Sequence, residues 1–198
     1  IHVWEGGNSG WCQDVQSLDS RGPWNREFIW NLLSQNQEPA RPAWSTPPID
    51  HIGAGPSGML HYPGLGESDR YTNAIFMVDY YGSGATVHAF KPVADGATFK
   101  TSDKHAYYSG VTVTDIDYGY DGRMYLSDWG GGWEPNPNGN IFTIANTTAL
   151  NDPARADAIA QVRELFNSGF AQRAPDELMQ LLAHRGQLRL EQRHFGAV

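Results

Sequence analysis

The 198-residue sequence contains one cysteine, Cys12. A single thiol forms no intrachain disulfide, and neither a zinc knuckle nor a CxxCH haem-attachment run can be drawn from it. The longest uninterrupted apolar stretches, such as residues 74–78, are about five residues long. Spanning a bilayer takes roughly 20. The sequence therefore excludes a disulfide framework, a cysteine-based metal site and a membrane-spanning helix.

Positive charge is also scarce. The chain has 14 Lys and Arg against 22 Asp and Glu, for a formal net charge of -8. This chain does not have the excess of positive charge that attracts a polyanion, so nucleic acid is not an expected partner. With 40% hydrophobic and 18% charged residues, the composition is typical of a folded protein.

Glycine and proline are abundant, at 22 and 12 residues, or about one residue in six, where roughly one in eight is usual. Before residue 151, short apolar runs alternate with turn residues, as in strands and turns. Seven strands of ordinary length are predicted. They cover residues 57–62, 73–80, 85–91, 97–105, 114–118, 123–128 and 140–145. The pairs Asp95-Gly96 and Asp121-Gly122 predict tight hairpin turns.

The strand pattern repeats. Ser57 and Thr114 are 57 residues apart, and each period ends its second strand in an acidic residue, Asp79 or Asp128. A four-stranded unit that recurs every 40 to 60 residues favours propeller blades, with a closed barrel as the alternative. The predicted fold is mainly β with a C-terminal α segment.

Helical periodicity begins after residue 150. Asn151 is predicted to cap a helix with Pro153 in its first turn, and Pro175 opens a second helix. Residues 187–198 begin a third apolar stripe. Helices joined by a tight turn are typical of a stacked helical repeat, which needs a continuation or a partner to cover its open face. Residues 1–150 and 151–198 are thus predicted to be separate domains.

Five runs, in the same order, resemble one known superfamily. They are residues 5–11, 21–27, 55–58, 115–122 and 127–133. The first, Glu-Gly-Gly-Asn-Ser-Gly-Trp, resembles the GGNYGW run of soluble quinoprotein sugar dehydrogenases of the glucose and sorbosone type. The others look more like bacterial membrane-bound dehydrogenase or haem-binding-domain proteins. The resemblance implies about two blades of a six-bladed propeller, followed by HEAT-like helices and often by a cytochrome c module.

The resemblance also bears on cofactors. In the relatives, the catalytic His and the groups that hold calcium and pyrroloquinoline quinone (PQQ) come mainly before the GGNYGW run, so no catalytic residue is expected in this chain. Two later quinone-binding positions do fall here. Residues 80–84 stand where the relatives have a Lys. Thr112 and Thr114 stand where the relatives have an Arg-x-Arg pair, and they are the candidate cofactor-binding residues. Neutral hydroxyls do not replace charge-assisted bonds.

Blade geometry is expected to gather residues 47–56, 80–84, 107–112 and 129–139 on one face. The candidate substrate-binding residues there are Asp79, Tyr80, Tyr81, Asp128, Trp129, Trp133 and Glu134, with Asp50, His51, Tyr107 and Tyr108 beside them. Aromatic rings stack on sugar rings, and carboxylates accept hydroxyl hydrogen bonds, so this set suits a neutral carbohydrate or polyol. Alternatively, Trp129 and Trp133 simply cap a blade.

Alternate carboxylates at Asp115, Asp117 and Asp121 suggest a calcium loop. An EF-hand, however, needs Gly where Tyr120 stands and Glu where Leu126 stands. We therefore expect these aspartates to stabilise a turn, and no metal site is predicted.

Taken with the resemblance, these features predict part of an exported, periplasmic or extracellular sugar or alcohol dehydrogenase-like protein that passes electrons to a quinone or cytochrome. Its expected partners are the remaining blades or a partner chain, and a cytochrome c module. The sequence begins at Ile1, and a longer parent is expected. The alternatives are a non-catalytic binding or scaffolding module, and a sugar hydrolase using Asp128 and Glu134.

Overall fold

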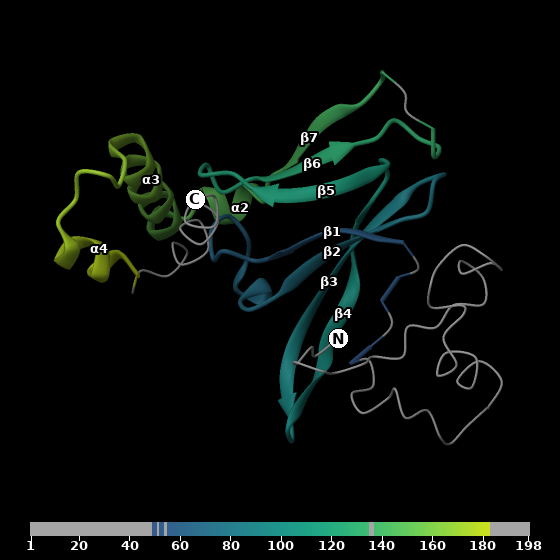
Figure 1. Ribbon diagram of the computed structural model, residues 1–198, viewed down its shortest axis with the longest axis horizontal. Coiled ribbons are helices and arrows are strands. Elements are labelled where there is room, and N and C mark those ends of the chain that lie inside the picture. The colour runs from purple at the N-terminus through teal and green to yellow at the C-terminus, as the bar shows by residue number, and fades with distance from the viewer. Residues whose placement is uncertain (1–48, 51, 54, 135–136, 183–198) are drawn as a thin grey trace, which may run out of the picture. The chain divides into compact units, whose positions relative to one another are not determined.

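The computed structural model describes residues 49–50, 52–53, 55–134 and 137–182 (Figure 1). The strands are β1 (Pro56–His61), β2 (Ile75–Tyr80), β3 (Ala85–Asp95), β4 (Thr98–Ser109), β5 (Val113–Tyr118), β6 (Met124–Asp128) and β7 (Asn140–Ile144). The helices are the 3-10 turn η3 (Asp69–Tyr71), α2 (Thr147–Leu150), α3 (Pro153–Ser168) and α4 (Pro175–Leu182). Each of the seven predicted strands is present and begins within two residues of its predicted start.

The chain groups into two compact units. One comprises residues 1–51 and 93–101, and in it the Thr101 hydroxyl donates to Asp50 Oδ2 at 2.5 Å. The other, called the sheet unit below, comprises residues 52–92 and 102–198. The predicted domain boundary between residues 150 and 151 stays a prediction.

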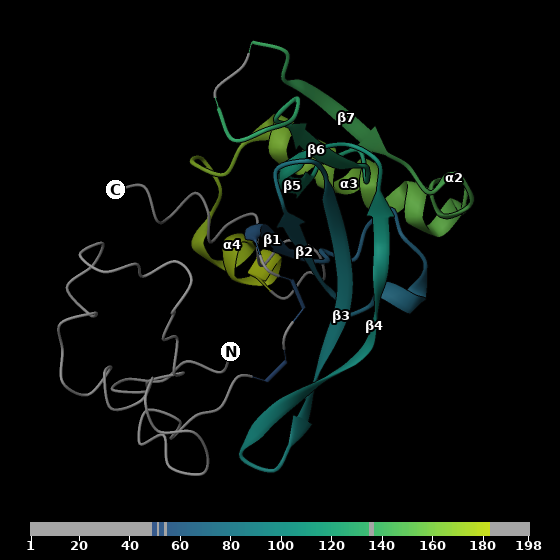
Figure 2. The same ribbon diagram turned by 90° about the vertical axis from the view of Figure 1, so that its right-hand side faces the viewer.

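The strands form two antiparallel sheets in chain order. The first sheet has the order β1-β2-β3-β4 and the second the order β5-β6-β7 (Figure 2). Glycines with positive φ, Gly96 at 63° and Gly122 at 76°, form the two predicted hairpin turns. The expectation of a mainly β chain with C-terminal helices is confirmed.

The two sheets have the same register. Across the first sheet, Met59 pairs with Met77, which pairs with His88. Across the second sheet, Ile116 pairs with Leu126, which pairs with Phe142. These two rows occupy equivalent positions, so the second sheet repeats the first three strands of the first sheet.

One hydrophobic core joins the sheets. The first sheet contributes the side chains that alternate with the Met59 row, and the second sheet contributes the Ile116 row. The largest contributions come from Leu60, Phe76, Val78, Val87, Val113, Ile116, Met124 and Leu126. β5 lies against β1 and β2. Because strand side chains alternate between faces, each sheet packs one face against the other sheet and leaves its second face outside this core.

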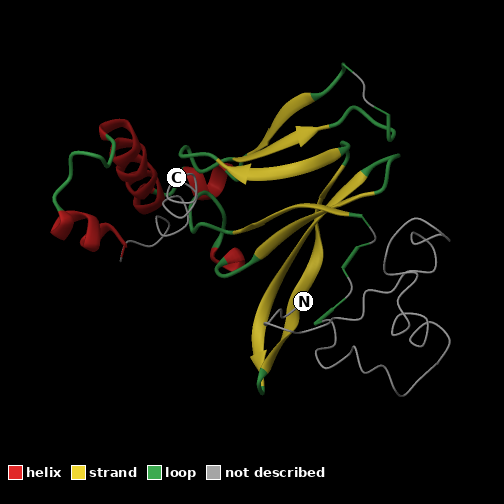
Figure 3. Cartoon of the chain, viewed as in Figure 1, coloured by secondary structure: helices red, strands yellow, loops and turns green. Residues whose placement is uncertain are grey.

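A second, smaller core fixes α3. Ile159 and Val162 pack with Leu65 from the loop after β1, and Phe166 stacks on Tyr120 with ring centroids 3.9 Å apart. The helices α2, α3 and α4 follow directly after β7 (Figure 3).

The capping of these helices differs from the prediction at one position. Asp152 caps α3 by accepting from the Arg155 N–H at 3.1 Å, while Asn151 ends the short helix α2, which the sequence reading missed. Asn146 caps α2 through the Ala149 N–H. The predicted third helical segment lies outside the described residues, and none of the described helices could cross a membrane.

The close approach of β1 to β5 can be tested at Gly58. A Cβ at this position would lie 2.7 Å from Asp115 Cα, so Gly58→Ala forces the strands apart. We expect a loss of about 1–3 kcal/mol in the free energy of unfolding. Urea denaturation measures it, with exposed Ser57→Ala as the neighbouring control; equal midpoints for the two variants would contradict the packing.

Candidate functional site

A carboxylate at the end of the second strand closes each sheet. Asp79 Oδ1 accepts a hydrogen bond from the Gly55 N–H at 2.7 Å. In the second sheet, Asp128 Oδ1 accepts from the Thr112 N–H at 3.0 Å. Gly55 and Thr112 each stand directly before the first strand of their sheet. The same side-chain contact therefore holds the start of the first strand to the end of the second in both sheets.

The backbone repeats the same closure. The Tyr80 N–H donates to the Gly55 carbonyl at 2.7 Å, and the Trp129 N–H donates to the Thr112 carbonyl at 2.9 Å. The loops that follow, residues 81–84 and 129–139, consequently leave equivalent corners of the two sheets.

Asp128 is held mainly by its own sheet. The Thr112 hydroxyl donates to Asp128 Oδ1 at 2.6 Å. This bond, together with bonds from the Gly130 N–H and the Asn140 side chain, lowers the pKa of Asp128 below its ordinary value. An ionised carboxylate with several donors is well suited to hold a loop in place. A direct substrate role for Asp79 or Asp128 stays a prediction.

The two equivalent loops contact each other. The Tyr80 hydroxyl donates to the Gly132 carbonyl, and the Gly132 N–H donates to the Gly82 carbonyl at 2.8 Å. The Trp133 ring meets Tyr80 edge-on, with centroids 5.0 Å apart. A Cβ on Gly82 would lie 2.7 Å from Trp133 Cε2, and the positive φ of 80° also favours glycine there. Gly82 thus makes room for the indole.

An open groove of about 450 Å³ lies beside these loops. It is lined by Tyr81, Ser83, Gly84, Ala85, Gly110, Val111, Thr112, Asp128 and Gly130. Tyr81, in its lining, is exposed by 49%, and Trp133, whose ring lies against Gly82 next to that lining, is exposed by 70%. The groove therefore combines hydroxyl groups and backbone with exposed aromatic surface.

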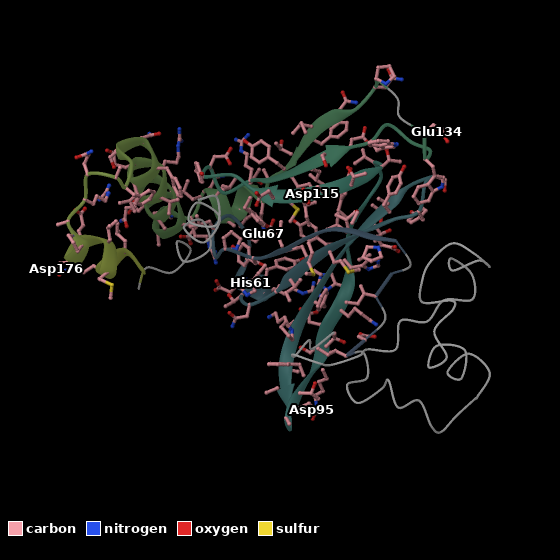
Figure 4. All side chains as sticks on the ribbon, in the orientation of Figure 1. His61, Glu67, Asp95, Asp115, Glu134 and Asp176 are labelled. Carbon is pink, nitrogen blue, oxygen red and sulfur yellow. The ribbon has the colours of Figure 1, made fainter. Side chains whose placement is uncertain are left out.

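The structure brings most of the predicted site residues to this end of the sheets. Tyr81, Thr112 and Asp128 line the groove, Trp129 follows Asp128, and Tyr80 is buried beneath Trp133. Glu134 is exposed on the loop after β6 (Figure 4). His51 lies outside the described residues.

Two candidates lie elsewhere. The Thr114 hydroxyl pairs with the Ser127 hydroxyl at 3.1 Å and is not part of the groove lining. Tyr107 belongs to β4, which continues to Ser109 beyond the predicted end at residue 105, so its ring packs into the core against Phe76. The expectation that Tyr107 lies on the binding face is wrong.

The carboxylates of the predicted acidic turn form local hydrogen bonds. The carboxylates of Asp115 and Asp117 each accept from the next residue's N–H at 2.9 Å, and Asp121 accepts from the Tyr125 hydroxyl at 3.0 Å. Within the described ranges, no three His, Cys, Asp or Glu side chains are placed to share a metal ion.

Sequence reasoning missed a buried carboxylate, Glu67, at the other end of the sheets (Figure 4). Glu67 as a whole residue is only 4% exposed, and its carboxylate accepts from the Tyr107 hydroxyl at 2.7 Å and from Asn146 Nδ2 at 3.0 Å. The Tyr62 hydroxyl accepts from the Glu67 N–H at 2.8 Å and donates to its carbonyl. Burial, followed by the bond to Glu67, raises the pKa of Tyr107. Glu67 thus connects the loop after β1 with β4 and with the cap of α2.

Comparison with protein families, curated proteins and solved structures gives no match.

The lowered pKa of Asp128 predicts a pH dependence of stability. The stabilisation is complete above the unfolded pKa of about 3.9 and is lost as the pH falls through the lower folded value. Wild-type Tm should therefore exceed that of Asp128→Asn at pH 6, with the difference shrinking below pH 4. Thermal scans from pH 6 to 2.5 test this, with exposed Asp157→Asn as control; a constant difference would refute it.

The hydrogen bond from the Tyr107 hydroxyl to Glu67 predicts that removing this hydroxyl lowers the stability of the protein. Tyr107→Phe removes one donor from a buried carboxylate, so the free energy of unfolding should fall by about 1–3 kcal/mol. Tyr108→Phe, on the next residue of β4, deletes a hydroxyl that does not contact Glu67 and should cost less. Chemical denaturation compares the two variants, and equal losses would argue against the assigned bond.

Proposed function

We propose that the two sheets are neighbouring blades of a β-propeller. Three observations support this. The strands of both sheets run in chain order, and the sheets pack face to face. In both sheets, an Asp near the end of the second strand accepts a hydrogen bond from the residue before the first strand. A repeated antiparallel sheet of this kind, stacked on its neighbour, is the building block of propellers.

The outer face of the first sheet supports a longer stack. Met59 and Met77 stand where the second sheet has Ile116 and Leu126. The latter pair is buried against the first sheet, whereas Met59 is exposed and Met77 half-buried. By the same repeat, a further sheet packs on the Met59 face.

The C-terminal helices support the proposed start of a HEAT-like array. α3 is fixed on the sheet unit through Ile159 and Val162, but α4 has no buried side chain among those described. Half-exposed Leu178 and Leu181 and exposed Met179 leave α4 with apolar surface available to another helix. Stacked helical repeats bury such surfaces against the next unit.

The exposed aromatic residues beside the groove favour a neutral carbohydrate or polyol as ligand, and this is the function that we propose. An indole exposed by 70% on a glycine-rich loop offers a flat apolar surface for the face of a sugar ring. Tyr81 and Ser83 add hydroxyls that donate to and accept from ring hydroxyls. The carboxylate of Asp128 and the net charge of -8 oppose an anionic ligand.

Following the resemblance, we propose that this surface belongs to a sugar or alcohol dehydrogenase-like parent, exported to the periplasm or outside the cell. There, the chain would provide a wall of the pocket and docking helices, and other residues would provide the base. The candidate quinone positions do not fit PQQ. The Thr112 hydroxyl donates to Asp128 and the Thr114 hydroxyl pairs with Ser127, and neither position offers a cation. This favours the second candidate, a cofactor-free binding or scaffolding module.

Trp133 carries the binding proposal. We expect the protein to bind methyl β-D-glucopyranoside or a related pyranoside or polyol with millimolar affinity, and Trp133→Ala to weaken binding at least tenfold through lost stacking. The matched control is Tyr125→Ala. It removes an exposed ring from the face of the second sheet that points away from the core. Titration followed by tryptophan fluorescence and calorimetry measures both variants; equal affinities, or no binding across a panel of neutral sugars and polyols, would exclude the site.

The dehydrogenase and the cofactor-free module differ in whether the complete protein contains a quinone chromophore. A quinone enzyme purified from its source shows quinone absorbance that calcium restores after chelation. The poor fit of Thr112 and Thr114 predicts no such absorbance, and a stoichiometric quinone spectrum would instead support the dehydrogenase.

A further inference from the structure

The outer edge of the second sheet differs from that of the first. In the first sheet, β4 covers the outer edge of β3. β7 occupies the position of β3, because Phe142 pairs with Leu126 as His88 pairs with Met77. In the part of the chain that the structure describes, no strand lies on the far side of β7. Among the described residues, the position equivalent to β4 is therefore unoccupied in the second sheet.

The residues of β7 do not protect this edge. Its sequence, Asn-Ile-Phe-Thr-Ile, has no charge and no proline, and Ile141 and Phe142 are exposed by 68% and 41%. Natural edge strands are usually protected by charges, prolines or bulges. β4, at the edge of the first sheet, has such protection in Lys104 and in Asp103, whose φ is 49°. An edge without protection is expected where another strand normally pairs.

We propose that β7 is completed by an uncharged, extended strand from a different polypeptide. The strand takes the position that β4 has on β3, so its backbone pairs with Asn140–Ile144. Phe142 shares a face with the buried Leu126, so the residue beside Phe142 is apolar and extends the core. Ile141 lies on the opposite face and requires a second apolar or β-branched neighbour.

Charge argues against a second copy of this chain as the occupant. Each copy carries a net charge of -8, and pairing β7 with β7 would place two acidic molecules side by side. The lack of charge on β7 offers nothing to offset that repulsion. A neutral strand from a different polypeptide avoids it.

Hydrogen exchange of the β7 amides tests the inference. We expect residues 140–144 to exchange at least 100-fold more slowly in the protein purified with its partners from its source than in the isolated 198-residue chain. A photo-crosslinking residue at Phe142 should then link to an uncharged segment of a different polypeptide. Ile141→Lys should weaken that association at least tenfold, while Phe99→Lys, at an exposed aromatic residue of β4, should not.

Other outcomes would overturn the inference. Fast exchange in both samples would mean that the edge is open. Protection in the isolated chain would mean that its own residues cover β7, and protection that grows with concentration would mean a second copy. The inference rests on the repeat of the two sheets, and the exchange experiment contains no ligand, so it is independent of the carbohydrate test.

Discussion

The packing of one sheet face on the other is the constraint on which the remaining structure depends. Phe76 and Val78 of the first sheet meet Met124 and Leu126 of the second in one apolar core. Gly58 permits the backbones of β1 and β5 to approach closely. Removal of this apolar surface from water is the main favourable term for the assembly of the two sheets. It also brings the equivalent corners of the two sheets together.

The proposed binding surface follows from that repeat. Because Asp79 and Asp128 close their sheets in the same way, the loops after β2 and β6 leave matching corners and can contact each other. The Tyr80 ring then packs edge-on against Trp133, and the Gly82 carbonyl accepts a hydrogen bond from Gly132 in the loop that carries Trp133. The carboxylates therefore act first on loop position, and the exposed aromatic rings are the better candidates for ligand contact.

Much of the sheet unit was predictable from the sequence, because strand alternation and turn residues are local signals. The runs before Asp79 and Asp128 and the Gly122 turn needed no knowledge of distant contacts. Glu67 could not be found in this way, since its partners Tyr107 and Asn146 lie 40 and 79 residues further along the chain. A charged residue in a polar loop gives no sequence signal that it will be buried.

The same distinction applies to the candidate site. The sequence predicted which residue types gather at this end of the sheets, but not that Thr112 donates to Asp128 or that Trp133 stays exposed. Tyr107 was misplaced because β4 continues four residues beyond the turn-based estimate of its end. Side-chain direction on a strand depends on register, which short-range patterns do not fix.

We propose that the two sheets are successive members of a longer stack of repeated sheets. An experimental density map of the protein purified from its source tests it most directly. We expect another sheet to cover Met59 and Met77, as the first sheet covers Ile116 and Leu126. A map in which both methionines face solvent in the complete protein would contradict it.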